Sequence, residues 1–511
     1  MLVVTPLTIL AETPQSQKAA ADHLLQMGKQ LFDKGQYKAA LESLQQALMI
    51  YQQIQDQNGE AVTLNELGKA YDGLSDYTRM GKAHQKALVL ARAIGNRNEE
   101  GNALNGVGDV YYYNSEHPKA MESYQQALTI FKAIGNRKGE AQSFSNIGVL
   151  YVGQGKYPNA LEYFQQTLDI SKQISDHKGE SSGLDNIGAV YSNLGQYPKA
   201  LEFYQQALAI RQKIGDRNGE GTTLNNIGGI YSIQGQYPRA LDFYQQTLAI
   251  RKQTGDRNGE GLALIGIGNI YSNLGQYAKA LEFYQQALAI RREISDRNGE
   301  SSLLDNIGGI YHSLGQYAKA LEFHQQALAI SRQMGARNSE GMTLNLIGTI
   351  YDDLGQYAKA LEFYQQALAI SRQIGDRNGE DTALSNIGGI YGHLGQYAKA
   401  LESYQQALAI SQKIGDHPGE GTILNNIGDI YSNLGQYAKA LEYFQRALVV
   451  NKQMGNPNSE GSTLSNIGSI YAQLGQYLKA LESSYGPRGR TLNADFRNRC
   501  PKINSRRPIA E

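Results

Sequence analysis

The sequence LGQYAKALEFYQQALAI at Leu274–Ile290 determines the fold of this chain. It recurs unchanged at Leu354–Ile370 and, with His324 in place of one tyrosine, at Leu314–Ile330. Looser copies run from Lys34 to Ser483, always 40 residues apart. Self-similarity at a fixed period of this size is typical of repeat proteins. The sequence therefore predicts one helical repeat that occurs about twelve times.

The repeat at residues 215–254 shows how one copy is built. Gly215 is expected to end a helix and Asp216 to cap the next one. The helix that Asp216 caps is the first helix of the repeat; it carries apolar residues at helical spacing and stops near Gly235. Pro238 then suits the first turn of a second helix. The apolar positions are Leu224, Ile227, Ile230 and Tyr231 in the first helix, and Ala240, Leu241, Phe243, Tyr244, Leu248 and Ile250 in the second. Each repeat is thus a pair of antiparallel helices of about 17 residues.

A glycine stands at the Gly228 position of every repeat. A glycine inside a helix costs about 1 kcal/mol relative to alanine, so its recurrence predicts a helix crossing too tight for a Cβ atom. The alanines equivalent to Ala240 have the same interpretation, with Met80 as the one departure. Met80, Gly81 and His84 also predict a weak second helix in the second repeat.

Stacked helix pairs bury the apolar stripes that no single pair can bury. We therefore predict an all-α solenoid over residues 19–484, whose last repeat breaks off. Residues 1–18 form a leader, either the remnant of an export signal or a plain apolar leader, so the compartment stays open. Residues 485–511 form a nonperiodic, basic tail. A truncated or frame-shifted gene end explains that tail best, and a basic arm for nucleic acid or an acidic partner is the alternative.

The composition excludes several classes of function. Lysine plus arginine number 48 and aspartate plus glutamate number 48, so the net charge is zero and no large nucleic-acid footprint is expected. No apolar run reaches the roughly 18 residues that span a bilayer. Cys500 is the single cysteine, so neither a disulfide framework nor a cysteine metal cluster is expected.

The residue pattern offers no catalytic constellation. The eight histidines are never three or four residues apart, as a helical metal pair requires, and they stand where other repeats carry other residues. The run that starts at Gly266 and Gly268 has Tyr271 in place of the third glycine of a dinucleotide motif. Glu140, Glu220 and their equivalents suit the positive end of the first helix. We expect no enzyme activity, no cofactor and no bound metal.

The recurring pattern of Leu224, Ile227, Gly228, Tyr231, Gly235, Tyr237, Ala240 and Tyr244 resembles the tetratricopeptide repeat. The resemblance covers residues 19 to 484. The length of 40 residues is similar to that of a long-repeat subclass found in spindle-orientation adaptors of the Leu-Gly-Asn type, in kinesin light chains and in many cyanobacterial proteins. It implies a right-handed superhelix whose first helices line a concave groove.

By the same resemblance, the groove is lined by the positions of Thr222, Asn225, Asn226, Gly229 and Ser232. An asparagine side chain offers both donors and an acceptor, so a ladder of asparagines suits the backbone of an extended peptide; the alternative is that each ties down a neighbouring helix. The predicted ladder is Asn146, Asn186, Asn226, Asn306, Asn386, Asn426 and Asn466, with Asn225, Asn269 and Asp352 as further groove residues.

Other groove positions differ from repeat to repeat, which is where specificity would lie. They are Lys69, Asp72, Asp109, Asn269, His312, Asp352 and Asp429. At the Thr222 position, the spindle adaptors carry an arginine that holds acidic peptides; this chain carries none there. A strongly acidic ligand is therefore not favoured.

Two functional hypotheses follow. The first is a non-catalytic scaffold that binds a protein or peptide partner in the groove. The second is the sensor array of a larger signalling protein, with a caspase-like protease or an ATPase as its missing effector. A further option is self-association through the uncapped C-terminal end.

Overall fold

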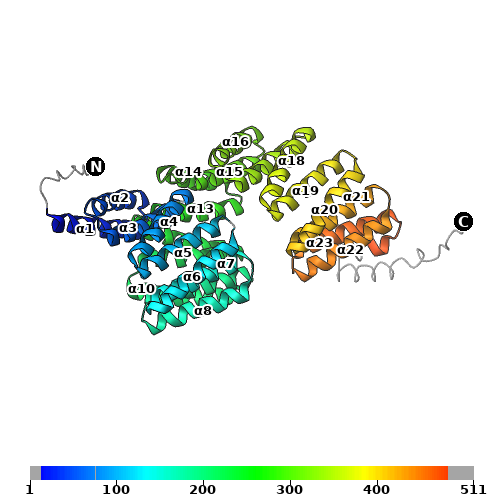
Figure 1. Ribbon diagram of the computed structural model, residues 1–511. Helices are drawn as coiled ribbons and strands as arrows, with labels where there is room; N and C mark the ends of the chain where they lie inside the picture. Colours follow the sequence, from blue (N-terminus) through cyan, green and yellow to red (C-terminus); the bar gives the residue numbers. More distant parts are fainter. Residues whose placement is uncertain (1–12, 75, 115, 481–511) are drawn as a thin grey trace. The chain divides into compact units, whose positions relative to one another are not determined.

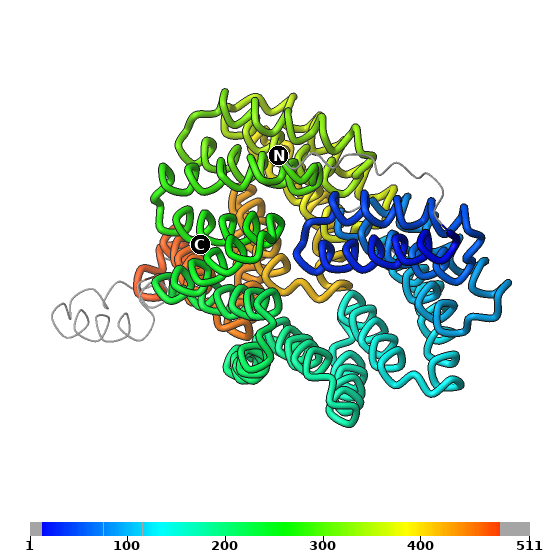
Figure 2. Tube along the Cα trace, turned by 90° about the vertical axis from the view of Figure 1, so that its left-hand side faces the viewer, coloured from blue at the N-terminus to red at the C-terminus, as the bar shows by residue number. Residues whose placement is uncertain are grey.

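The chain is all α-helical over the part that the computed structural model describes, which is residues 13–74, 76–114 and 116–480. The predicted leader and tail fall largely outside these residues. Helix α1 begins at Pro14, ahead of residue 19, where the sequence placed the start of the array. Helices follow one another through short turns (Figures 1 and 2).

Within the described residues, each of the first eleven repeats contributes two helices and the last contributes α23, all of 17 or 18 residues apart from the longer α1. The first helices are α1 (Pro14–Asp33), α3 (Gln57–Gly73), α5 (Arg97–Tyr113), α7 (Arg137–Gly153), α9 (His177–Asn193), α11 (Arg217–Ile233), α13 (Arg257–Asn273), α15 (Arg297–Ser313), α17 (Arg337–Asp353), α19 (Arg377–His393), α21 (His417–Asn433) and α23 (Pro457–Gln473). The second helices are α2 (Tyr37–Gln53), α4 (Tyr77–Ile94), α6 (His117–Ile134), α8 (Tyr157–Gln173), α10 (Tyr197–Ile214), α12 (Tyr237–Thr254), α14 (Tyr277–Glu293), α16 (Tyr317–Met334), α18 (Tyr357–Ile374), α20 (Tyr397–Ile414) and α22 (Tyr437–Gln453).

The chain divides into two compact parts, residues 1–303 and 304–511, and each is a stack of helix pairs. From α1 to α14 and from α16 to α23, each helix packs against the next one along the chain, as α11 does against α12 and α12 against α13. This arrangement confirms the predicted solenoid of paired helices.

The predicted caps are confirmed. Gly215 takes a left-handed backbone conformation, with φ of 70°, and ends α10. One residue later, the Asp216 carboxylate accepts a hydrogen bond from the Gly219 backbone N–H at 3.0 Å and begins α11. Most glutamates of the first turn are buried, and Glu380 shows how they are paired. It accepts from Arg372 at 2.8 Å and from Arg377 at 2.6 Å.

The core of each repeat is a set of aromatic and aliphatic side chains shared between successive pairs. The ring of Tyr231 stacks on Phe243 of the same repeat, with centroids 5.4 Å apart. Tyr244 packs against Ile267 and Ile270 of the next repeat. Burial of these rings and of the aliphatic side chains around them stabilises the stack, because it removes apolar area from water.

The recurring glycine has the predicted steric cause, although the neighbour is a side chain. A Cβ atom on Gly148 would lie 2.5 Å from the ring of Phe164, and one on Gly268 would lie 2.5 Å from Tyr284. The ring comes from the second helix of the same repeat. We call this place in the second helix the ring position; His84 and His324 occupy it in two repeats.

The prediction of a weak second helix in the second repeat is wrong. Helix α4 is complete, and both Met80 and His84 are buried. The imidazole of His84 fills the ring position against Gly68, and the flexible Met80 side chain takes the place of alanine.

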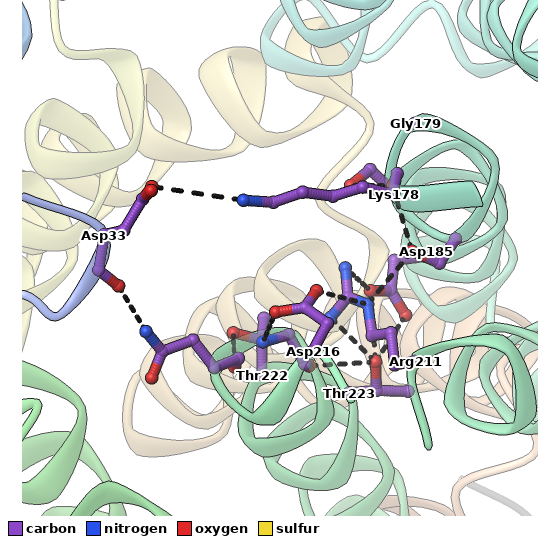
Figure 3. A network of polar contacts seen from close by, with 12 residues as sticks. Asp33, Lys178, Gly179, Asp185, Arg211, Asp216, Thr222 and Thr223 are labelled. Atoms are coloured by element: carbon purple, nitrogen blue, oxygen red, sulfur yellow. Dashed lines mark hydrogen bonds and ion pairs between the residues drawn. The ribbon is translucent and has the colours of Figure 1, made fainter. Parts of the chain in front are cut away.

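The sequence analysis missed three buried arginines at the ends of α10, α12 and α14. Arg211 is 6% exposed and lies between Asp185, at 2.7 Å, and the Thr223 hydroxyl, at 3.0 Å (Figure 3). Burial raises the pKa of Asp185 to about 6, although Arg211 and Thr223 oppose the shift. Arg251 and Arg291 are held by Asp256 and Asp296. Figure 3 also shows Lys178 extended toward Asp33, 4.0 Å away.

Candidate functional site on the first helices

The first helices form a continuous polar face within each part of the chain. Helix α5 contacts both α3 and α7, and α19 contacts both α17 and α21. We define the A face as the accessible residues at the Thr222, Asn225, Asn226, Gly229 and Ser232 positions of these helices. The positions equivalent to Thr222 are mostly exposed, and the asparagines are partly or fully exposed.

The side-chain amides of six predicted A-face asparagines form no hydrogen bond within the described residues, so their donors and acceptor are available to a ligand. They are Asn225, Asn226, Asn306, Asn386, Asn426 and Asn466. An amide that is accessible and unpaired within the protein can exchange its water partners for a peptide backbone at little cost.

The other predicted residues have partners in the protein. Asn146 donates to Asp109 at 3.4 Å, and Asn186 donates to Ser145 at 3.2 Å, so these two tie neighbouring first helices together. Asn269 accepts from the Tyr284 hydroxyl at 2.6 Å. Asp352 pairs with His393 at 3.3 Å. The ladder is therefore divided between structural and accessible members.

The A face is hollowed in the N-terminal part, where a cavity of about 460 Å³ lies over α3, α5 and α7. We call it the α3–α7 cavity. It brings together Lys69, Asp72 and Asp109, which the sequence analysis had named only as variable positions. Its further lining includes His84 and Asn105, which are 2% and 6% exposed.

Three titratable side chains that line this cavity have pKa values shifted by burial. Burial raises the pKa of Asp109 to about 7, against a hydrogen bond from Tyr124, and the charge of Asp72 adds to the shift. Burial also raises the pKa of Asp72. Burial lowers the pKa of His84 to about 4, with a contribution from Lys69. Perturbed groups gathered in a concave site are typical of binding sites.

Sequence reasoning missed His84, Asn105 and Gly106 as members of this cavity. Gly106 stands where most repeats carry the ladder asparagine, and a Cβ atom there would lie 2.4 Å from the His84 ring. The available signal was that His84 and Gly106, in two adjacent repeats, both differ from the residues that most other repeats carry at the same positions. The sequence alone does not show that the His84 ring packs against the Gly106 backbone, because the two residues lie on different helices.

A larger cavity of about 590 Å³ is lined by turn residues that include Lys34, Asp216, Asn218 and Lys252. None of its lining residues is buried. Asn218 contributes one buried oxygen without a hydrogen-bond partner among the described residues, and the rest of the lining consists of accessible turn and helix-end residues.

Comparison with protein families gives one extended match. The model of the tetratricopeptide repeat matches residues 73–133, 99–173, 139–213, 180–253, 219–293, 259–333, 299–373 and 379–453, which together cover well over half of the chain. Comparison with curated proteins finds no match.

Solved structures with the same type of fold are only distantly similar. Aspartyl phosphate phosphatase F from Bacillus subtilis is 17% identical with a TM-score of 0.47, over 69% of this chain and 93% of that one. A Rap protein in complex with competence and sporulation factor is 15% identical with a TM-score of 0.48, over 70% and 99%. A signal-transduction ATPase with a tetratricopeptide repeat sensor from Pyrococcus horikoshii is 15% identical with a TM-score of 0.47, over 71% and 53%. Similarities this low say nothing about ligands.

A search of the described helices for one both long and apolar enough to cross a membrane finds none. The hypothesis of a sensor array in a larger signalling protein stays a prediction.

Proposed function

Because this chain belongs to the tetratricopeptide repeat family, we propose that it is a non-catalytic scaffold that binds an extended segment of a partner protein along its A face. The proposal includes the absence of enzyme activity. The finer assignment to the long-repeat subclass rests on the 40-residue period alone.

The observation that carries the proposal is the set of accessible asparagines without partners in the described chain. An extended peptide exposes N–H and C=O groups in alternation, and each asparagine amide can pair with both kinds. Asn386, Asn426 and Asn466 lie 40 residues apart on the successive first helices α19, α21 and α23, and their amides would hold a backbone largely independently of its sequence. Variable A-face neighbours would then select the side chains.

The test begins with a selection of random twelve-residue peptides on the full chain. The dissociation constants of the selected peptides are then measured for a variant in which Asn306, Asn386, Asn426 and Asn466, all in the part from residue 304 onward, are changed to alanine. We expect affinity to fall at least tenfold, since each lost hydrogen bond contributes roughly 0.5–1.5 kcal/mol.

A matched control changes four amides that are exposed on second helices, namely Gln245, Gln285, Gln325 and Gln405. This variant removes the same chemistry from the other face and should bind normally. The proposal fails if the asparagine variant retains full affinity while circular dichroism shows an intact fold, or if the selection returns no peptide.

A further inference from the structure

Two buried side chains present unpaired polar atoms to the α3–α7 cavity. The amide of Asn65 donates to Glu99 at 2.8 Å, so its oxygen is the acceptor that faces Nδ1 of His84 at 3.2 Å. The proton of the neutral imidazole therefore lies on Nδ1, and Nε2 is a bare acceptor. Asn105 accepts from Ser143 at 3.2 Å through its oxygen. Neither His84 Nε2 nor Asn105 Nδ2 has a partner among the described residues.

The charges of the cavity fall into two classes. Lys69 pairs with Glu66 at 2.9 Å and Lys138 with Asp176 at 3.6 Å, and both lysines are exposed. Asp72 and Asp109 are recessed, and their neighbours are neutral: the Tyr113 hydroxyl beside Asp72, and Tyr124 and Asn146 beside Asp109. Each lysine at the edge of the cavity thus already has a carboxylate partner, whereas Asp72 and Asp109 form no ion pair with any described residue.

We propose that the α3–α7 cavity is the specificity pocket for an arginine side chain of the bound peptide, an inference that rests on the proposed function. Asp72, Asp109 and His84 Nε2 supply acceptors from three different helices, α3, α5 and α4. A guanidinium group carries five N–H donors in a planar fork and no acceptor, so it matches this set better than the compact lysine ammonium does.

The remaining donor suits the backbone of the same ligand residue. Asn105 Nδ2 can donate to a peptide carbonyl, which a free metal ion would not offer. The described residues also contain no group of three histidine, cysteine, aspartate or glutamate side chains placed to hold a metal. An anionic side chain would face two uncompensated carboxylates and is disfavoured for that reason.

The probes are four fluorescein-labelled nonapeptide libraries that have randomised flanks and differ only in the central residue: arginine, citrulline, lysine or glutamate. Citrulline keeps the shape of arginine without its charge. Fluorescence polarisation with the full chain measures the apparent dissociation constant of each library. We expect the arginine library to bind at least tenfold more tightly than the citrulline library, and the glutamate library most weakly.

The decisive variant is Asp72→Asn combined with Asp109→Asn, which should remove the preference for arginine over citrulline. Its matched control is Asp169→Asn combined with Asp242→Asn, which removes two aspartate charges from exposed positions on the second helices α8 and α12, away from the A face. The control should keep the full preference. Circular dichroism and thermal melting verify that both variants fold.

Equal binding of the arginine and citrulline libraries overturns the inference, as does a preference that survives the Asp72 and Asp109 changes. If the arginine and citrulline libraries bind equally while the peptides from the earlier selection still lose affinity for the four-asparagine variant, the A-face scaffold stands and only the arginine pocket fails. If no library binds, the inference and the proposed function fail together.

Discussion

At the scale of single residues, the glycine common to the first helices leaves room for a ring of the second helix. Helical periodicity predicted that something approaches this glycine closely. It could not show that the neighbour is a side chain, because that depends on the rotamer of the residue at the ring position. Gly308 and Gly309 separate the steric effect from helix propensity, since a Cβ atom on Gly308 meets His324 at 2.8 Å and one on Gly309 meets nothing within 4 Å.

Gly308→Ala should therefore destabilise the protein by roughly 1–3 kcal/mol, typical of overpacking in a well-packed core. Gly309→Ala should be neutral or stabilising by up to about 1 kcal/mol, since alanine favours the helix. Urea unfolding of both variants measures the difference. Equal stabilities for the two neighbours would contradict the packing of the His324 ring against Gly308.

Asp109 gives a prediction about pH. Its pKa is about 7 in the folded protein against an ordinary value of 3.8, so between these values the folded state holds a proton that the unfolded state releases. The contribution of Asp109 to the free energy of unfolding therefore decreases as pH rises from about 4 to 7. Asp109→Asn should raise the melting temperature at pH 8 and change it little at pH 4.

His84 produces the opposite trend over the same range. Its folded pKa is about 4 against an ordinary value of 6.5, so stability falls as pH drops below about 6.5. The trends of Asp109 and His84 oppose each other in the natural protein, with Asp72 and Lys69 as further charged neighbours. The Asp109→Asn variant should thus lose stability on acidification more steeply than the natural protein. A lower melting temperature of the variant at pH 8 would contradict the uncompensated burial of Asp109.

At the scale of helices, the repeat pattern predicted well where helices begin and end, but it predicted poorly how the residues that differ from the repeat are packed. The glycines and capping aspartates that recur every 40 residues fix where helices begin and end, as at Gly215 and Asp216. Helix α4 was misjudged because its unusual residues compensate one another in three dimensions. The buried arginines were missed for a related reason: a charged residue on a helix is usually solvated, and only the fold shows that Arg211 is enclosed with Asp185.

The Arg211–Asp185 pair predicts strong coupling between α9 and α10. Asp185→Ser alone leaves a buried guanidinium without its carboxylate and should cost about 3–5 kcal/mol. Arg211→Ser places at this site the residue that Ser171 and Ser371 supply in other repeats. The double variant should therefore lose much less than the sum of the two single losses, as measured by denaturant unfolding. Additive losses would show that the two side chains do not interact.

At the scale of the whole molecule, the period and the apolar stripes were sufficient to predict a solenoid of helix pairs. The candidate site was predicted only in outline. The asparagine columns located the A face, but which amides are accessible depends on contacts such as Asn186 with Ser145. The α3–α7 cavity depends on three helices together, which no single column describes.

The modular architecture predicts how the chain tolerates deletions. Removal of residues 377–416 deletes one full repeat and joins Asp376 to His417, so an aspartate still caps α21. This variant should fold with unchanged helical content per residue and a smaller denaturant m-value, since less surface is buried. Removal of residues 377–396 deletes only α19 and its turn, so α20 would follow α18 directly and its apolar face would no longer meet a first helix. This variant should be less stable than the deletion of a full repeat. Equal stability of the two deletions would contradict the pairwise packing.

The central claim is that a peptide binds to the A face, and photocrosslinking tests it most directly. A photoreactive benzoylphenylalanine replaces exposed Thr382 on α19 in one variant and exposed Gln405 on α20 in another, and each is irradiated with the tightest peptide from the selection. The account predicts a crosslinked product from position 382 and none above background from position 405. Crosslinking from position 405 alone would contradict it.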